Sequence, residues 1–311
     1  MLNEQDIINV KSWMSLGDCN YEIDHDDDSI PESGVVYCNI EHIHKLFAKC
    51  AHTDNEYVVV SGFSDYGVAY QKEHPVWLDM RKHLHLLTDF VTEDLGYNSL
   101  SVPARCELET SFPEHKYSVR CYSYTYSTFP EIPKNIKKWF VVNAMIEDDV
   151  VQGIPLGVGK DSGPEFFKRL KQIDLSSKEG YLYVNWQNYT LERAELKNYF
   201  LSHSPSWCTI RTEPLPFDEY LDEISRHAFV MCPAGNGVDC YRVLEAIYLG
   251  CIPIVEDSPT MRHLDGLPIL RVRSLYDVTF SMLKNYLDSF TNTYSLDKAS
   301  LSYWKDQIYG T

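Results

Sequence analysis

The sequence predicts an α/β protein made of two Rossmann-like domains, and three observations lead to this prediction. Short apolar runs typical of buried strands alternate with segments whose apolar residues recur at helical spacing. Residues 229–256 contain a strand, a glycine-rich turn, a helix and a second strand in immediate succession, which indicates one βαβ unit of a parallel sheet. The chain has 311 residues, enough for two domains, and a Pro/Gly-punctuated connection at 151–159 lies near its middle.

The first half of the chain offers strands separated by helices and loops. Its strongest strand signal is the run of three valines within residues 57–61, which polar residues flank. We also expect strands at 35–40 and 136–143, helices at 41–50 and 77–95, and a strand or extended insertion at 117–125. Gly96 stands where the longer helix would end.

The second half alternates helix and strand throughout, which is the pattern of a doubly wound domain. The expected strands are 181–186, 207–211, 227–231, 252–255 and 269–272, and the expected helices are 164–173, 191–202, 217–226, 241–249, 276–290 and 297–309. We therefore expect an N-terminal domain over residues 1–152 and a C-terminal domain over residues 153–290. Residues 291–311 are expected to form a C-terminal helix that packs back on the N-terminal domain.

Charge and cysteine usage exclude several kinds of partner. With 45 acidic and 28 basic residues the formal net charge is −17, which argues against nucleic acid or an anionic membrane as the main partner, because both need a basic surface. No apolar run approaches the ~20 residues of a membrane span, and the polar start MLNEQDIINV lacks the apolar core of a signal peptide. The nine cysteines are odd in number and unclustered, so we expect free thiols in a reducing compartment, the cytoplasm.

Residues 229–256 carry the clearest functional signal. Asp239 stands where a helix N-cap is expected, and Gly250 stands where the same helix would end. Arg242 and Glu245 are three residues apart, so they share one face near the helix start. Backbone amides and an arginine suit phosphates, while a carboxylate suits ribose hydroxyls, so this arrangement favours a nucleotide ligand. The alternative is that Glu245 lies on a solvated face or only forms a salt bridge with Arg242.

Two common nucleotide motifs are absent from this stretch. The turn lacks the G-x-G-x-x-G spacing of a dinucleotide fold and the lysine of a P-loop, so neither NAD nor ATP is supported. No His/Cys spacing predicts a zinc site, and the acidic run at 24–28 lacks the Gly and Glu of an EF-hand, so we interpret it as a solvated turn.

The run CPAGNGVDCYRVLEAIYLGCIPIVED resembles the C-terminal signature of exostosin-like glycosyltransferases and their inverting relatives. The spacing of Asn185, Thr190 and Arg193 and the IPLG sequence at residues 154–157 fit the same superfamily. The chain is also similar to the small soluble glycosyltransferases of large algal viruses, including a xylosyltransferase. This resemblance implies the GT-B architecture, with two Rossmann-like domains facing across a cleft, and a host-cytoplasmic location if the protein is viral.

The resemblance also implies roles for particular residues. Glu245 would hold the ribose of a nucleotide-sugar, Arg242 and Arg193 would face its diphosphate, and Asn236 and Gly237 would line the donor site together with Asn185 and Thr190. The donor is expected to be a UDP-sugar, with xylose preferred, and a glycan hydroxyl is the expected acceptor. Inversion would proceed with no cofactor and no essential metal. The chain has Cys240 and Tyr241 where the family pattern has Thr and His.

An inverting transfer needs one general base, which takes the proton of the acceptor hydroxyl. In GT-B enzymes this base comes from the N-terminal domain, and Asp65, in the loop after the strand at 57–61, is the first candidate. The alternative for Asp65 is a turn-capping role, since Asp is common in turns. The other candidates are carboxylates and imidazoles of the first half, namely Glu147, Asp148, Asp149, His42, His44 and His74.

Two other functions fit the same sequence. One is a fucosyltransferase-like enzyme with a GDP-sugar donor, in which a similar helix carries the ribose-binding glutamate. The other is a non-catalytic carbohydrate-binding protein whose sugar-binding surface would draw on the 22 tyrosines and 6 tryptophans.

Overall fold

The computed structural model describes residues 2–21, 30, 32–63, 67–68, 127–128, 131–146, 148–187, 190–235, 237–291 and 293–310. The chain divides into two compact units. The first, here called the C-terminal unit, consists of Met1–Ser12, Pro155–Asp257 and Leu264–Gln307. The second, the N-terminal unit, consists of Trp13–Ile154, Ser258–His263 and Ile308–Thr311. The domain limits expected from the sequence remain predictions.

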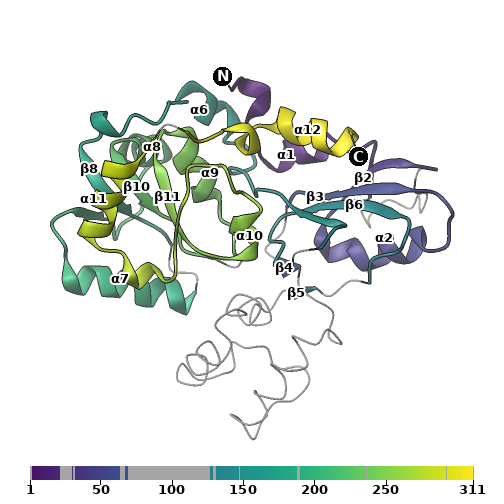
Figure 1. Cartoon of the computed structure of the whole chain (residues 1–311), viewed down its shortest axis with the longest axis horizontal. Coiled ribbons are helices and arrows are strands. Elements are labelled where there is room, and N and C mark those ends of the chain that lie inside the picture. Colours follow the sequence, from purple (N-terminus) through teal and green to yellow (C-terminus); the bar gives the residue numbers. More distant parts are fainter. Residues whose placement is uncertain are drawn as a thin grey trace, which may run out of the picture. The chain divides into compact units, whose positions relative to one another are not determined.

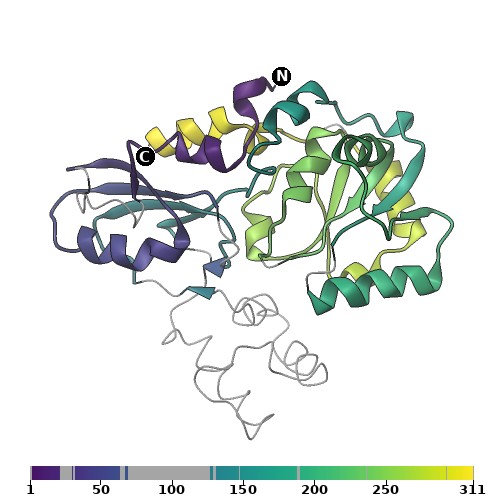
Figure 2. The ribbon, with the colours of Figure 1, turned by 180° about the vertical axis from the view of Figure 1, so that it is seen from behind.

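The N-terminal unit is built on a parallel sheet with the strand order β1-β2-β3-β6-β7. Its strands are β1 (Cys19–Tyr21), β2 (Gly34–Cys38), β3 (Tyr57–Ser61), β6 (Ile136–Val141) and β7 (Val151–Gly153). The 3-10 helix η2 (Ile40–His42) and helix α2 (Ile43–Cys50) connect β2 to β3, and α2 lies along one face of the sheet (Figures 1 and 2). A separate parallel pair joins β4 (Gly67–Val68) and β5 (Ser127–Thr128).

The core of the N-terminal unit follows from the apolar runs of its strands. Val59 and Val60 of β3 are fully buried, and Val59 pairs with Trp139 of β6. The Trp139 indole donates a hydrogen bond to the Ser61 hydroxyl at 2.9 Å, and its ring meets that of Phe47 edge-on, with centroids 5.2 Å apart. Trp139 of β6 therefore joins β3 and the helix α2.

The C-terminal unit contains a second parallel sheet, with the order β12-β11-β10-β8-β9. Its strands are β8 (Gly180–Val184), β9 (Cys208–Ile210), β10 (His227–Met231), β11 (Ile252–Glu256) and β12 (Leu270–Val272). Its main helices are α6 (Gly163–Lys168), α7 (Leu191–His203), α8 (Phe217–Ser225), α9 (Tyr241–Tyr248) and α11 (Phe280–Ser289). Two parallel sheets with helical connections are consistent with two Rossmann-like domains, while the GT-B arrangement remains a prediction.

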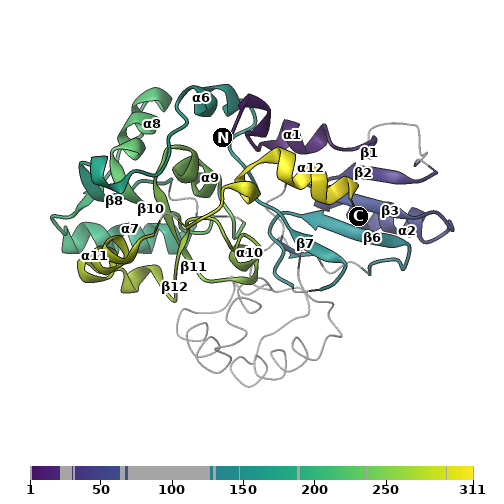
Figure 3. The same cartoon turned by 45° about the horizontal axis from the view of Figure 1, so that its top comes forward.

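Helices cover both faces of this second sheet (Figure 3). Leu196 and Phe200 of α7 and Leu283 of α11 join one buried cluster with Phe229 and Met231 of β10. Helix α8 contacts β10, and helix α9 contacts both β10 and β11. Burial of the apolar faces of these helices accounts for the near-continuous apolar character of β10 and β11, as expected for strands covered on both sides.

The terminal segments also pack in the C-terminal unit. The 3-10 helix η1 (Glu4–Asp6) is followed by Ile8, whose backbone N–H donates to the Tyr248 hydroxyl at 3.0 Å. The same hydroxyl donates to the carbonyl oxygen of Ala299 at 2.8 Å, in η7 (Asp297–Ala299). One buried tyrosine of α9 therefore joins segments from both ends of the chain.

Several elements differ from those expected. The stretch at 151–159 was expected to be a connection, but its first residues form the strand β7, which pairs with β6. A strand of three residues is too short to be recognised from its own sequence. Helix α6 ends at Lys168 rather than at 173. Helix α11 begins at Phe280, because the Thr279 side chain caps it and the 3-10 helix η6 (Leu275–Asp277) precedes it. The region expected as one helix at 297–309 is η7 followed by α12 (Leu301–Tyr309).

Some expected features lie outside the described residues. These are the acidic run at 24–28, the helix at 77–95 with Gly96, and the element at 117–125. The cysteines within the described residues are all free thiols, as expected. Within the same residues, no helix combines the length and the apolar character that crossing a bilayer requires.

Candidate functional site

The strand order of the C-terminal unit brings two loops together. From β8 the chain moves outward to the edge strand β9, and from β10 it moves in the opposite direction to β11 and β12. Strands β8 and β10 are adjacent, with Tyr183 paired to Val230, so the loops that follow them start side by side. In open parallel sheets this reversal of direction is where ligands bind, beyond the carboxyl ends of the strands. The two loops are residues 185–190, before α7, and residues 232–240, before α9, here called the glycine loop.

The start of α9 differs from the expectation in one respect. Its N-cap is Cys240, whose side chain makes no capping hydrogen bond, so the prediction that Asp239 caps the helix is wrong. The Asp239 carboxylate instead accepts a hydrogen bond from the backbone N–H of Leu156 at 2.8 Å, which ties the glycine loop to the IPLG segment. Asp239 is 4% exposed, and burial raises the pKa of its carboxyl to about 7. At the other end Gly250 follows the C-cap with φ of 71°, which confirms the expected helix end.

Arg193 holds the glycine loop from the side of α7. Its Nε donates to the carbonyl oxygen of Ala234 and its Nη2 to that of Pro233, both at 2.9 Å. A Cβ atom at Gly235 would lie 2.8 Å from the same Nη2, so a larger residue there would displace the Arg193 guanidinium from its present position. Thr190 caps α7, since its hydroxyl accepts the backbone N–H of Arg193 at 3.3 Å. Thr190 thus fixes the start of α7, and Arg193 of the same helix holds the glycine loop.

Asn185 lies at the carboxyl end of β8 and is also engaged within the protein. Its Nδ2 donates to the Tyr183 hydroxyl at 2.8 Å, and that hydroxyl donates to Glu223 at 2.7 Å. Gly237 lies in the turn of the glycine loop, where its carbonyl oxygen accepts the N–H of Gly235 at 2.9 Å. Asn236 lies outside the described residues.

Glu245 is buried, which excludes the expected alternative of a solvated helix face for this residue, while Arg242 on the same turn is partly exposed. Glu245 is 8% exposed, and burial raises its pKa, opposed by the charge of Arg242 and by a hydrogen bond from Tyr220. The Tyr220 hydroxyl donates to Glu245 Oε2 at 2.6 Å. The Arg242 guanidinium lies over the Tyr220 ring, 5.9 Å from its centroid. Within the described residues Arg242 Nε has no hydrogen-bond partner.

Tyr220 and Lys197 were missed by the sequence reasoning. Lys197 lies one helical turn after Arg193 in α7, a spacing that was visible in the sequence. It is 6% exposed, its Nζ donates to the carbonyl oxygen of Trp186 at 2.6 Å, and Nζ lies 5.8 Å from the Trp186 ring centroid. Burial, and then the charge of Arg242, lowers the pKa of Lys197. Tyr220 had no sequence signal, since it comes from α8.

The cluster is locally cationic although the chain carries a net charge of −17. Arg193, Lys197 and Arg242 converge around the glycine loop, and their charges reach Cys240 or one another. A hydrogen bond with Cys232, and then the two arginines, lower the pKa of the Cys240 thiol to about 6 against the opposing effect of burial. Buried cations are stable only when anions or acceptors compensate them. Backbone carbonyl oxygens compensate Arg193 and Lys197 in this structure, and the charge of Glu245 acts on Arg242.

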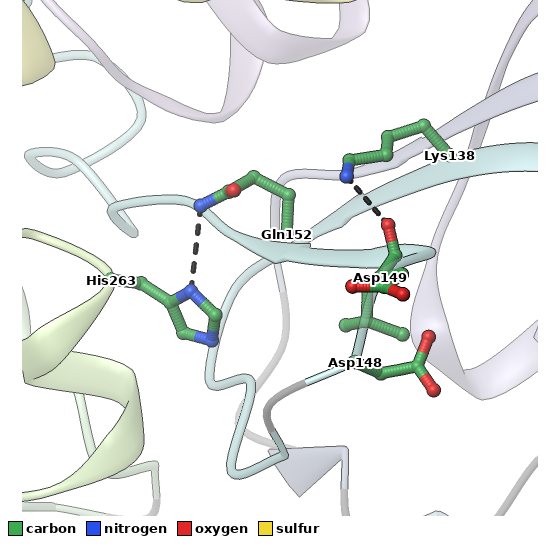
Figure 4. A pocket seen from close by; sticks show the side chains of 6 residues that line it. Lys138, Asp148, Asp149, Gln152 and His263 are labelled. Carbon is green, nitrogen blue, oxygen red and sulfur yellow. Dashed lines mark hydrogen bonds between the residues drawn. The ribbon is translucent and has the colours of Figure 1, made fainter.

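The N-terminal unit contains a polar pocket of about 550 Å³ (Figure 4). It is lined by Lys138, Asp148, Asp149, Val151, Gln152 and His263. The His263 ring is held at both nitrogens, by the carbonyl oxygen of Ile146 at 3.1 Å and by the Gln152 amide at 3.4 Å. The Asp148 carboxylate accepts the N–H of Val150 at 2.7 Å, so it caps a turn.

The candidate bases are only partly placed. Asp65, Glu147 and His74 lie outside the described residues. His42 is the residue before α2, and Asp148 and Asp149 line the polar pocket. Within the described part of the chain, no group of three or more His, Cys, Asp or Glu side chains is arranged to hold a metal ion.

Cations and one carboxylate around a glycine loop, at the carboxyl ends of parallel strands, are typical of nucleotide sites. Comparison with known proteins indicates which class of nucleotide-binding protein this site belongs to. Residues 186–287 match the family model described as the RXYLT1 C-terminal domain. A 44-residue segment is 41% identical to ribitol-5-phosphate xylosyltransferase 1 of Mus musculus, covering 14% of this chain and 10% of that protein. Both findings point to a glycosyltransferase, and the chain aligns with only a tenth of the relative's length.

Proposed function

We propose that the protein is an inverting glycosyltransferase that moves a sugar from a UDP-sugar, with xylose preferred, to a hydroxyl of a glycan. The observation that carries this proposal is the buried Glu245 beside the partly exposed Arg242 at the start of α9, within the segment that matches the RXYLT1 C-terminal domain. The xylosyltransferase named in the comparison supports the choice of sugar. The free cysteines support a reducing compartment, the cytoplasm.

The residues divide the work of donor binding in this proposal. Glu245 accepts hydrogen bonds from the ribose hydroxyls, and Arg242 and Lys197 compensate the diphosphate charge. Arg193 faces the diphosphate from behind the glycine loop, whose amides at Asn236 and Gly237 line the donor. Asn185 and Thr190 belong to the second loop of the same site and keep its shape.

The reaction itself needs one proton transfer and one stabilised leaving group. The acceptor oxygen attacks the anomeric carbon while the bond to the diphosphate breaks, and a base removes the hydroxyl proton. Asp65 is the proposed base. The cations of the donor site stabilise the negative charge that develops on the departing diphosphate. No metal is required in this proposal, so activity should persist in excess EDTA.

Calorimetric titration of nucleotides tests the donor site. We expect wild type to bind UDP more tightly than GDP or CMP. Glu245→Gln keeps the shape of the side chain and an acceptor for Tyr220, and we expect it to weaken UDP binding at least tenfold, about 1.4 kcal/mol. If none of the three nucleotides binds wild type, the proposed function is lost. Tighter binding of GDP would favour a GDP-sugar enzyme instead.

A second experiment tests the chemistry. Asp65→Asn is expected to retain UDP binding and to lose at least ~10²-fold in transfer, as expected when a general base is removed. Normal turnover in this variant would assign the base to another residue. Nucleotide binding without hydrolysis or transfer of any nucleotide-sugar would favour a non-catalytic carbohydrate-binding protein.

A further inference from the structure

Tyr220 contacts both charged groups at the start of α9. Its hydroxyl donates to Glu245 Oε2 at 2.6 Å, and its ring faces the Arg242 guanidinium with the centroid 5.9 Å away. Tyr220 comes from α8, 22 residues before Arg242, and α8 contacts β10, the strand that leads into the glycine loop. One side chain therefore bridges a carboxylate and a cation that the sequence places one helical turn apart.

The Tyr220 ring is partly exposed and has an aromatic neighbour on its own helix. Phe217, one turn earlier in α8, stacks on it with ring centroids 6.3 Å apart and planes at 29°. Burial, and then the neighbouring Glu245 against the opposing charge of Arg242, keeps the pKa of the Tyr220 hydroxyl well above its usual range, so it is a permanent hydrogen-bond donor near neutral pH. This hydrogen bond restricts the orientations that are open to the Glu245 side chain.

Glu245 needs such a partner if it is to bind hydroxyl groups. An ionised carboxylate accepts hydrogen bonds at both oxygens and more strongly than the protonated group, which has a donor on one oxygen, and burial favours the protonated form. The Tyr220 bond and the charge of Arg242 both favour the ionised form. The bond also occupies Oε2, which leaves Oε1 for a ligand.

The other titratable groups around this carboxylate come from two further elements. Cys232 and Cys240 are the first and last residues of the glycine loop, and the charge of Glu245 acts on both thiols. Arg193 and Lys197 of α7 face the same cluster through Cys240 and Arg242. Tyr220 alone of these groups donates a hydrogen bond to Glu245 within the described residues.

We infer that Tyr220 is a positioning residue of the donor site, whose hydroxyl holds the Glu245 carboxyl group for the ribose and whose ring holds the Arg242 guanidinium for the diphosphate. This inference rests on the proposed function for the identity of the ligand. Its physical content, the control of Glu245 by Tyr220, holds for the protein without any nucleotide.

Two substitutions separate the hydroxyl from the ring. Tyr220→Phe removes only the hydroxyl, so Arg242 keeps its ring contact while Glu245 loses its donor. Tyr220→Leu removes both contacts. Tyr181→Phe is the matched control, because Tyr181 is a partly exposed tyrosine of the same unit, at the start of β8. Circular dichroism and the unfolding midpoint of each variant establish that it is folded.

The first measurement needs no ligand. Carbon NMR of the Glu245 carboxyl, assigned with Glu245→Gln, follows its titration in the free protein. We expect Tyr220→Phe to raise the Glu245 pKa by about one pH unit or more, since a hydrogen bond to a charged group favours the ionised form by that order. Tyr181→Phe should leave the titration unchanged. An unchanged Glu245 pKa in Tyr220→Phe would refute the inference.

The second measurement is the pH profile of UDP binding. For Tyr220→Phe we expect wild-type affinity within about threefold at pH 8.5 and an acidic limb moved upward by about one pH unit, because Glu245 protonates earlier. Tyr220→Leu is expected to bind UDP at least tenfold more weakly at every pH. If wild type binds no nucleotide, the proposed function fails, while the titration of Glu245 still decides the role of Tyr220.

Discussion

The buried Asp239 carboxylate makes the stability of the protein depend on pH. Its pKa is raised to about 7 from the ordinary 3.8, chiefly by burial, although the backbone N–H groups of Leu156 and Cys240 favour the charged form. Above about pH 4 the unfolded chain therefore releases a proton that the folded protein retains. Folding is favoured by this retention, so its contribution is complete below the unfolded pKa and is lost as the pH rises to about 7.

The magnitude follows from the shift. Between pH 5.5 and pH 8 the folded protein keeps the proton over about 1.5 pH units, at about 1.4 kcal/mol for each unit, so wild type should lose roughly 2 kcal/mol of unfolding free energy through this group. Asp239→Asn retains an oxygen that accepts the Leu156 N–H but does not titrate. The pH dependence of its stability should be smaller by the same roughly 2 kcal/mol.

Urea unfolding of both proteins at the two pH values measures this difference. The lower value stays above the sequence pI of about 5.0, where solubility is lowest. Titrating groups that do not interact with Asp239 cancel in the double difference, whereas the Cys240 thiol, whose charge acts on Asp239, does not, so both proteins are measured in a Cys240→Ser background. An equal pH dependence in wild type and Asp239→Asn would mean that Asp239 is ionised throughout, and the reasoning from its burial would be refuted.

Three further substitutions have defined outcomes. Gly250→Ala should destabilise the protein by about 2 kcal/mol or more in urea denaturation, because φ is 71° and the new Cβ would lie 2.6 Å from the Gln172 carbonyl oxygen. Gly266→Ala is the control, because φ there is 101° but no atom lies within 4 Å of the new Cβ. It should show only the smaller cost of the backbone strain. Tyr248→Phe leaves one buried amide and one buried carbonyl unsatisfied, so thermal unfolding should report a loss of about 2–4 kcal/mol, and a loss below about 0.5 kcal/mol would contradict these bonds. Arg193→Lys keeps the charge but loses the two hydrogen bonds that the guanidinium donates to the glycine loop, so UDP affinity in calorimetry should fall about tenfold. An unchanged affinity would contradict the anchoring role of Arg193.

Where the information was local, the sequence was sufficient to predict the fold. The strands at 57–61 and 227–231 have the predicted bounds, because a run of buried β-branched and apolar residues with polar or turn flanks is compatible with few other structures. Gly250 was predicted as the helix end for an equally local reason, since a left-handed residue is needed there. The three-residue strand β7 was not predicted, because it is defined by its pairing with β6 rather than by its own residues.

The candidate site divides in the same way. Arg242, Glu245 and the glycine loop were recognisable because they are close in sequence and follow a strand, and Lys197 was within reach of the same reasoning through its spacing from Arg193. The burial of Glu245 and Lys197 could not be predicted from the sequence, since it depends on how α7, α8 and α9 cover the sheet. Asp239 was assigned to a cap because its neighbours suggested one, whereas its carboxylate bonds Leu156, 83 residues away.

Sequence alone thus determined the kind of site, a glycine loop followed by a cation and a carboxylate on one helical turn. The tertiary structure decided which residues surround it. Strand β8 lies beside β10 although β9 separates them along the chain, and this order brings Arg193 to the glycine loop. Packing of α8 then brings Tyr220 to Glu245. Such contacts join elements tens of residues apart, so they follow from strand order and burial, which no local pattern encodes.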